Sequence, residues 1–507
     1  MGRKVLAAKS GRAACPNAAA GDGIAAKNAK GAKSFSTGFT GLREVSVKPA
    51  KTKPSGVAWL GDIPDGWKMM VGKHVYTVQA GAPFDSTKFS NVSGFPLVRI
   101  RDITSGKSET YYTGDYEAKD VVHDGDLLVG MDGDFHVRWW QGGEALLNQR
   151  CCKIQPRDVI TSRFAYYFLP FALADINAIA YATTVKHLSN WDLENVRIPL
   201  PPLPEQRAIA NYLDEKCGAI DAAVAEAKKG IEEYKAWKKS LIFEVVTGKR
   251  RVGFFNAESK CARDEVVGLP ERSEPEGLQG AARRRVAEKM KSSGIPWIGD
   301  VPEGWKVMKL KYLIDVLPGY AFKSEGFDFS NGVRLLRGIN VGVSSLKWDE
   351  CVYWSSVINE ELATYQIQDG DLIIGLDRPW IADGTRVCFA KKEDLPCLLV
   401  QRVCRLRSLG GVILQIVNYW LSSEGFESAL SCETTGVSVP HISPGQIMEF
   451  RIALPSLHEQ RAIADYLDEK CAAIDAMIAE KEALIADLEA YKKSLIYETV
   501  TGKREVL

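Results

Sequence analysis

The sequence lacks several features that would place it in a familiar class. Its 11 cysteines include no Cys-x-x-Cys spacing, which argues against a zinc motif and favours reduced thiols over a disulfide framework. No apolar run reaches the ~18 residues of a membrane-spanning helix, and the N-terminus has no apolar core of the signal-peptide kind. We therefore expect a cytoplasmic protein that does not engage a membrane.

Motifs for covalent chemistry are also missing. The sequence has no complete Gly-x-x-x-x-Gly-Lys-Ser/Thr phosphate loop and no Asn/Asp-Pro-Pro-Tyr/Phe motif of amine methylases. Its 6 histidines form no His-x-His or His-x-x-x-His pair, and His187 and His441, which occupy matching positions, fit packing or capping better than catalysis. The sequence predicts no catalytic residue, no metal site and no cofactor held by this chain.

Bulk positive charge is lacking outside the N-terminal tail. Residues 1–54 carry 11 Lys/Arg against 2 Asp/Glu, whereas the whole chain of 507 residues has a net charge of only +1. The region 55–203 has 14 basic against 17 acidic residues, and 294–457 has 15 against 19. Any affinity for nucleic acid would have to come from local clusters.

Internal repetition is the strongest signal in the sequence. The segment Gly56–Lys68 (GVAWLGDIPDGWK) recurs as Gly294–Lys306 (GIPWIGDVPEGWK). The segment Glu205–Arg250 matches Glu459–Arg504 without a gap, with 31 of 46 positions identical. Between these blocks only short islands match. The chain is therefore two copies of one unit, with similar scaffolds and different surfaces.

The matching segments are predicted to be long helices. Apolar residues follow alternating spacings of three and four along both, which is the coiled-coil pattern, and a Thr-Gly-Lys-Arg sequence ends each helix. About 40 residues at 1.5 Å each give a helix roughly 60 Å long. The variable regions are of mixed type. The expected strands are Leu97–Ile103, Leu127–Val129, Leu372–Ile374 and Leu398–Leu406, and the expected helices are Phe164–Ile179 and Val412–Leu421.

These patterns predict an α+β fold with six segments. They are a basic disordered tail (1–54), a first variable domain (55–203), a first conserved helix (204–250), a linker (251–293), a second variable domain (294–457) and a second conserved helix (458–507). The tail is compatible both with a functional basic arm and with an over-extended start of the chain.

The order of the repeats resembles a known family. A Trp-Leu-Gly-Asp-Ile-Pro-x-Gly-Trp start, a variable domain and a Glu-Gln-Arg helix opening, all present twice, closely resemble the specificity (S) subunit of type I restriction-modification systems. The resemblance covers about residues 54–507 and does not extend to the N-terminal tail.

The resemblance implies a non-catalytic subunit that reads double-stranded DNA. In this family two target-recognition domains each read one half of a bipartite, asymmetric site. Two conserved helices pack antiparallel as a coiled coil and dock two modification (methyltransferase) subunits, which restriction (endonuclease) subunits then join. S-adenosylmethionine, ATP and magnesium belong to those partners.

Two loops are the best candidates for DNA contact, because each follows a Gly-Asp-apolar strand and carries arginine beside tryptophan. Arginine donates two bonds to guanine, glutamine pairs with adenine, and an aromatic ring stacks or wedges. A solvated turn packed on its own domain is the alternative. The predicted DNA-binding residues are His136, Arg138, Trp139, Gln149, Arg150, Arg378, Trp380, Arg386, Gln401 and Arg402.

The helices carry more apolar surface than one seam needs, which favours further helices from partner subunits over a self-contained hairpin. The residues predicted at the subunit interface are Tyr212, Leu213, Ile220, Trp237, Leu241, Tyr466, Leu467, Ile474, Tyr491 and Leu495. The sequence leaves two alternatives open. One is a coiled-coil scaffold that pairs protein partners without reading DNA, and the other is an enzyme whose site the sequence does not reveal.

Overall fold

The computed structural model describes residues 51–179, 187–252, 289–431 and 440–506. The tail expected at 1–54 lies outside the described residues up to position 50, and the linker expected at 251–293 lies outside them from 253 to 288.

The chain divides into two compact units. Unit 1 joins residues 1–219 to 490–507, and unit 2 comprises residues 220–489. Each unit thus contains one variable region, part of the conserved helix that follows it, and the distal part of the helix from the other repeat.

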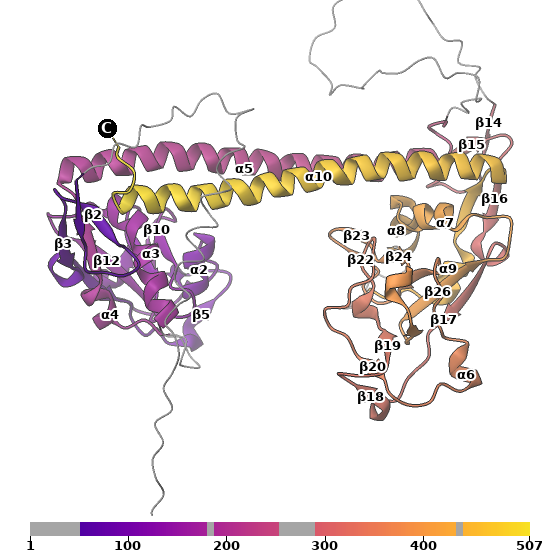
Figure 1. Cartoon of the computed structure of the whole chain (residues 1–507), viewed down its shortest axis with the longest axis horizontal. Helices are drawn as coiled ribbons and strands as arrows, with labels where there is room; N and C mark the ends of the chain where they lie inside the picture. The colour runs from indigo at the N-terminus through magenta and orange to yellow at the C-terminus, as the bar shows by residue number, and fades with distance from the viewer. Residues whose placement is uncertain (1–50, 180–186, 253–288, 432–439, 507) are drawn as a thin grey trace, which may run out of the picture. The chain divides into compact units, whose positions relative to one another are not determined.

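Unit 1 is built on two small sheets (Figure 1). One is antiparallel in the order β10-β9-β12-β4, and the other has the order β5-β7-β6-β11-β8 with a parallel β6–β11 pair. The strands are β1 (Thr52–Pro54), β2 (Asp62–Pro64), β3 (Lys68–Val71), β4 (Tyr76–Ala80), β5 (Phe89–Ser90), β6 (Phe95–Val98), β7 (Tyr111–Tyr112), β8 (Val121–Val122), β9 (Leu127–Gly130), β10 (Val137–Trp139), β11 (Ala145–Leu147), β12 (Cys151–Pro156) and β13 (Arg197–Leu200). The helices are α2 (Ile100–Ser105), α3 (Ser162–Ile179), α4 (Asn190–Asn195) and the start of α5 (Leu203–Val246).

Unit 2 repeats this topology. The order β24-β21-β26-β17 corresponds to β10-β9-β12-β4, and β18-β20-β19-β25 corresponds to β5-β7-β6-β11. The strands are β14 (Met290–Ser292), β15 (Asp300–Pro302), β16 (Lys306–Lys309), β17 (Ile314–Pro318), β18 (Phe327–Asp328), β19 (Val333–Leu336), β20 (Tyr353–Trp354), β21 (Leu372–Gly375), β22 (Trp380–Ile381), β23 (Gly384–Thr385), β24 (Val387–Phe389), β25 (Cys397–Leu399), β26 (Val403–Ser408) and β27 (Arg451–Leu454). The helices are α6 (Glu360–Ala363), α7 (Leu414–Leu421), α8 (Glu424–Ser431), α9 (Pro444–Glu449) and α10 (Leu457–Val500).

The predicted antiparallel coiled coil of α5 and α10 is confirmed, and the two helices lie side by side within unit 2 (Figure 1). Lys238 Nζ lies 2.7 Å from Asp475 and Lys228 Nζ lies 3.8 Å from Glu489, so an earlier residue of α5 faces a later residue of α10. Each helix has 44 residues, or about 66 Å at 1.5 Å per residue. The three-and-four spacing of apolar residues explains the pairing, because it keeps one stripe turned toward the partner helix.

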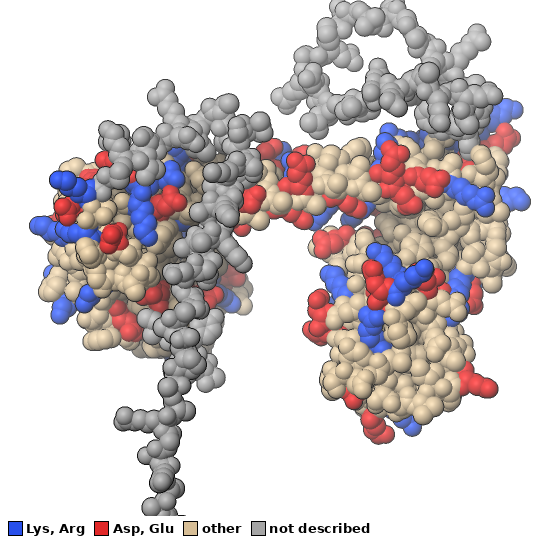
Figure 2. Space-filling view, in the orientation of Figure 1, with Lys and Arg blue, Asp and Glu red and all other residues tan. Residues whose placement is uncertain are grey.

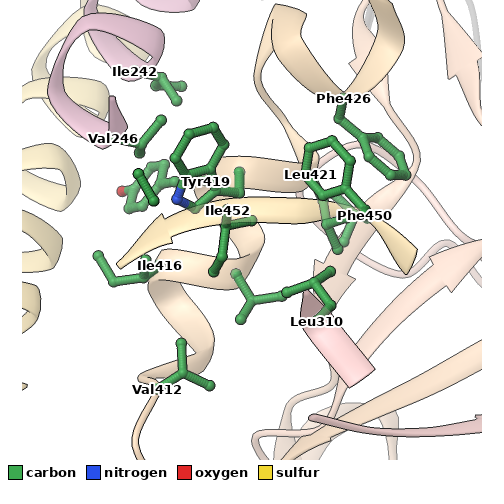
Figure 3. Close-up of a cluster of buried hydrophobic side chains, with 14 of the residues drawn as sticks. Ile242, Val246, Leu310, Val412, Ile416, Tyr419, Leu421, Phe426, Phe450 and Ile452 are labelled. Atoms are coloured by element: carbon green, nitrogen blue, oxygen red, sulfur yellow. The ribbon is translucent and has the colours of Figure 1, made fainter. Parts of the chain in front are cut away.

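The C-terminal end of α5 is embedded in the core of unit 2. Figure 3 shows Ile242 and Val246 beside Tyr419 of α7, with Phe450 and Ile452 beyond them. These side chains are all nearly excluded from water. The last turns of α5 therefore form part of the unit 2 core, although most of that unit comes from the second repeat.

Two strand predictions need correction. The segment Leu97–Ile103 is a strand only as far as Val98. Helix α2 begins there instead, because the Asp102 carboxylate accepts a hydrogen bond from Arg99 N at 2.9 Å and caps the helix N-terminus. The segment Leu398–Leu406 is two strands, β25 and β26, separated by a turn in which Arg402 has a positive φ of 69°. The helices expected at Phe164–Ile179 and Val412–Leu421 correspond to α3 and α7.

Candidate nucleic-acid interface

The conserved Glu-Gln-Arg opening attaches each long helix to its domain. In unit 1, Trp67 Nε1 donates to Glu205 at 2.9 Å, and in unit 2 Trp305 Nε1 donates to Glu459 at 3.1 Å. Both tryptophans are buried, in keeping with an anchoring role. The repeated Trp and Glu-Gln-Arg motifs thus tie the start of each long helix to its own domain.

The first candidate loop joins β9 to β10. It begins at buried Met131, passes Phe135, which is buried at a φ of 51°, and ends at exposed His136. Arg138 follows on β10, where Nε donates to Ile103 O at 2.7 Å and a second nitrogen donates to Thr104 O. The Arg138 guanidinium therefore caps carbonyls at the end of α2.

Trp139 is half-buried in unit 1. Its ring meets Tyr166 edge-on at 6.5 Å between centroids, and the Arg163 guanidinium lies 4.9 Å from the ring centre. Cation–π and edge contacts of this kind stabilise one orientation of an aromatic side chain. Trp139 is accordingly held against α3.

The second candidate loop joins β21 to β24 and is longer. Arg378 is exposed, with a φ of 44°. The Trp380 ring packs against Phe426, with 5.9 Å between the ring centroids. Arg386 Nε donates to Val341 O at 2.9 Å and its NH1 donates to Asp377 O at 3.0 Å. Burial lowers the pKa of Arg386 below its usual value, although Asp377 counteracts this effect.

The strand register shows which residues of the two loops correspond. Gly130 N bonds His136 O, and Gly375 N bonds Arg386 O, so His136 and Arg386 are equivalent. Residues 131–136 in unit 1 therefore correspond to 376–386 in unit 2. The second loop is five residues longer than the first, although the two loops join equivalent strand pairs.

A second pair of turns carries Gln149-Arg150 and Gln401-Arg402. All four side chains are exposed. Arg150 and Arg402 adopt positive φ values of 75° and 69°, in the left-handed region that favours glycine. These turns lead into the equivalent strands β12 and β26 and are alike in both units.

Each of these arginines belongs to a cluster centred on one carboxylate. His187 Nδ1 lies 2.7 Å from Asp132 Oδ1, and Arg150 NH1 lies 3.4 Å from the same oxygen. We call this set the unit 1 cluster.

The unit 2 cluster has the same composition. His441 Nδ1 lies 2.6 Å from Asp377 Oδ1, and Arg402 NH1 donates to Asp377 Oδ2 at 2.6 Å. Burial raises the pKa of Asp377, but hydrogen bonds from Arg402 and His441 outweigh it and the net shift is downward.

Sequence reasoning named the arginines of these clusters but missed Asp132 and Asp377, and it interpreted the two histidines as packing or capping residues. The histidines are about half exposed and bond a carboxylate. The matching positions of His187 and His441 in the two repeats were the available signal. The structure also gathers Arg378, Arg386 and Arg402 around Asp377, whereas Arg138 lies apart from the unit 1 cluster, at the end of α2.

Most of the residues predicted at a subunit interface are covered by this chain itself. Six are buried and two are half-buried, while Trp237 is 47% exposed and Tyr491 is 39% exposed. The buried residues are Leu213, Ile220, Leu241, Leu467, Ile474 and Leu495, and the half-buried ones are Tyr212 and Tyr466. The apolar helix surface left uncovered thus includes the equivalent positions Trp237 and Tyr491.

Charge on the described surface is mixed. Figure 2 shows basic and acidic side chains interspersed on the visible face of each unit. Within the ranges that the structure describes, no group of three or more His, Cys, Asp or Glu residues is arranged to hold a metal ion. None of the described helices is long and apolar enough to cross a membrane.

Comparison with known proteins identifies the family. The family described as "Type I restriction modification DNA specificity domain" matches residues 64–229 and 302–486, which together exceed half of the chain. The type I restriction enzyme EcoBI specificity subunit of Escherichia coli is 26% identical over 446 residues, covering 87% of each protein. The MjaVIII specificity subunit of Methanocaldococcus jannaschii is 27% identical, covering 76% of this chain and 80% of that protein.

A solved structure shares the fold. A chain from a study of complex assembly and conformational transition of the type I R-M system superimposes with a TM-score of 0.60 at 17% identity, covering 86% of this chain and 98% of its own. The duplicated sheets, the paired long helices and the two sequence matches lead to one conclusion: the chain belongs to the type I restriction-modification DNA specificity family.

Proposed function

We propose that this chain is the DNA-reading subunit of a type I restriction-modification complex and that each unit reads one half of a bipartite, asymmetric site. The observation that carries the proposal is the pair of equivalent loops, 131–136 and 376–386, which differ in length and sequence on matching strands. A common scaffold with different loops is what two readers of different base sequences require.

The proposal includes docking of two modification subunits and of restriction subunits. The exposed aromatic side chains of Trp237 and Tyr491, at equivalent positions of α5 and α10, support a protein partner on the helices. S-adenosylmethionine, ATP and magnesium would be held by those partners, and the complex would act on DNA in the cytoplasm.

Exchanging one variable domain is expected to change one half-site only. Replacing residues 294–455 with the corresponding region of a relative should alter the half-site read by unit 2, because the unit 1 loop remains intact. Methylated adenines mapped by sequencing host DNA would report both half-sites. Simultaneous change of both halves would contradict independent reading.

The reciprocal exchange of residues 55–203 is the matched control, and it should alter the other half-site. A complex that assembles normally yet binds DNA without sequence preference in both exchanges would favour the scaffold alternative.

The chain alone is expected neither to methylate nor to cleave DNA, because no motif for either reaction occurs in its sequence. Incubating the purified chain with DNA, S-adenosylmethionine, ATP and magnesium should give no product. Adding the modification subunits should restore methylation. Reproducible methylation by the chain alone would refute a non-catalytic role.

A further inference from the structure

The two carboxylate-centred clusters have the same composition, although the loops beside them differ in length and sequence. Unit 1 joins Asp132, Arg150 and His187, which are up to 55 positions apart in sequence. Unit 2 joins Asp377, Arg402 and His441 in the same way. In each unit the Asp and the His are also linked by an isolated backbone bridge. The adjacent loops, in contrast, have six and eleven residues.

The arginine in each cluster occupies a strained backbone position. Cys151 N bonds Asn148 O at 3.2 Å, which places Arg150 third in a tight turn, with a φ of 75°. Glycine is favoured at such a position, and another residue there costs on the order of 1–3 kcal/mol. Among the described residues, the only non-glycine positions with positive φ are Phe135, Arg150, Arg378 and Arg402. All four flank the two clusters, and strain of this kind concentrates at functional sites.

The arginine in each cluster presents hydrogen-bond donors to solvent. The side chain of Arg150 is 58% exposed and that of Arg402 is 68% exposed. A guanidinium has five N–H donors, and in both clusters NH1 is the nitrogen that contacts the aspartate, which leaves the donors of Nε and NH2 for another partner. The histidines use Nδ1 toward the carboxylate, which leaves Nε2 directed away from it.

A feature kept identical on two different reading surfaces serves something common to both half-sites. The phosphate backbone is the part of DNA that does not change with sequence. We propose that Arg150 and Arg402 contact DNA phosphates at equivalent places in the two half-sites, with the Asp132–His187 and Asp377–His441 pairs fixing the direction of the arginine side chains. This inference rests on the proposed function. It supplies the local phosphate affinity that net-acidic domains need.

Glycine substitution separates this role from a structural one. Arg150→Gly and Arg402→Gly remove the guanidinium and place the preferred residue at a positive φ, so the unfolding midpoint should stay the same or rise. DNA affinity should fall roughly tenfold at ~0.1 M salt in each variant. The slope of log affinity against log salt should drop by about 1 in each single variant and by about 2 in the double variant.

The measurement uses the full chain assembled with its modification subunits. The probes are one 40-base-pair duplex that carries the mapped methylation site and one of scrambled sequence. A phosphate contact predicts the same fold-loss on both duplexes. The charge-matched control is Lys229→Ala, an exposed position on α5, which should leave both the affinity and the slope unchanged.

Three results would overturn the inference. A loss confined to the specific duplex, with relaxed preference at one base pair, would make the arginine a base reader. A lower unfolding midpoint with an unchanged salt slope would make the cluster a structural link between loops. Unchanged affinity and slope would leave it without a DNA role. If the unaltered complex showed no salt-dependent DNA binding, the proposed function itself would fail.

Discussion

Replacing Gly502 with alanine is expected to destabilise unit 1 by about 3 kcal/mol. Gly502 ends α10 with a φ of 72°, and an added Cβ would lie 2.3 Å from Pro64 Cδ and 3.3 Å from the Trp67 ring. The left-handed backbone costs an alanine about 1 kcal/mol, and forcing a carbon against a rigid proline ring adds roughly 1–3 kcal/mol. Gly248→Ala should have the same effect on unit 2, where the Cβ would lie 2.5 Å from Pro302 Cδ.

Gly61→Ala is the matched control, because Gly61 has a φ of 69° but an added Cβ would meet nothing within 4 Å. It should cost only the backbone strain of about 1 kcal/mol. Denaturant unfolding of the full chain, monitored by circular dichroism, measures the unfolding free energy of all three variants. Equal losses at positions 61 and 502 would show that close packing of the helix end on Pro64 contributes nothing.

The repeated parts of the fold could be predicted closely from the sequence. The conserved helices expected at 204–250 and 458–507 occupy Leu203–Val246 and Leu457–Val500. Two near-identical copies make a periodic pattern hard to mistake, and local signals, glycine and proline, mark both ends. The proline-and-tryptophan start of each repeat also follows local rules, since it is a turn with a buried ring.

The candidate site could be predicted only in part, because its geometry depends on contacts between distant residues. The sequence shows that both candidate loops follow a Gly-Asp-apolar strand, but it does not show which residues of the two loops correspond. The strand register instead aligns Arg386 with His136, and Arg138 reaches carbonyls 35 positions away. Asp132 meets a histidine 55 positions later. The spacing of residues along the sequence does not predict contacts between positions this far apart. The unequal lengths of the two loops also prevent a direct alignment of their residues.

The Glu-Gln-Arg opening of each long helix contains a buried glutamine, and the spacing of residues in the sequence does not predict its hydrogen bonds. Gln206 is fully buried at the start of α5. Its Oε1 accepts from Thr161 N at 2.9 Å, and its Nε2 donates to Val159 O at 3.0 Å and to Pro201 O at 2.9 Å. All the amide's main bonding directions are therefore satisfied by backbone groups of unit 1.

Gln460 makes the same three kinds of bond in unit 2. Its Oε1 accepts from Ile413 N at 2.9 Å, and its Nε2 donates to Gly411 O at 3.1 Å and to Pro455 O at 3.0 Å. Because buried polar groups left without partners cost about 1–3 kcal/mol each, this glutamine is a strong constraint on how each helix joins its domain.

Gln206→Glu is therefore expected to destabilise unit 1 by about 4 kcal/mol at pH 7. The substitution keeps the shape but turns a carboxylate oxygen toward two carbonyl oxygens at a fully buried position. Burial and the facing carbonyls should raise the pKa of the new carboxyl group in the folded state, so keeping it ionised there costs about 3 kcal/mol, and the lost amide hydrogen bond adds roughly 1 kcal/mol. Gln460→Glu should weaken unit 2 in the same way, whereas exposed Gln149→Glu should change the unfolding free energy very little.

The pH dependence of Gln206→Glu follows from the sign of that shift. Between the unfolded pKa near 4.3 and the higher folded pKa, the folded chain binds more protons than the unfolded chain, so the variant loses stability as pH rises. Lowering the pH from 8 to 5 should recover about half of the deficit relative to the unaltered protein measured at the same pH. About 2 kcal/mol should remain at pH 5. Roughly 1 kcal/mol persists because this pH still lies above the unfolded pKa, and roughly 1 kcal/mol because a protonated carboxyl group donates one bond where the amide donates two. Unfolding midpoints at four pH values across this range would test the prediction, and a deficit independent of pH would show that the carboxyl group escapes to solvent.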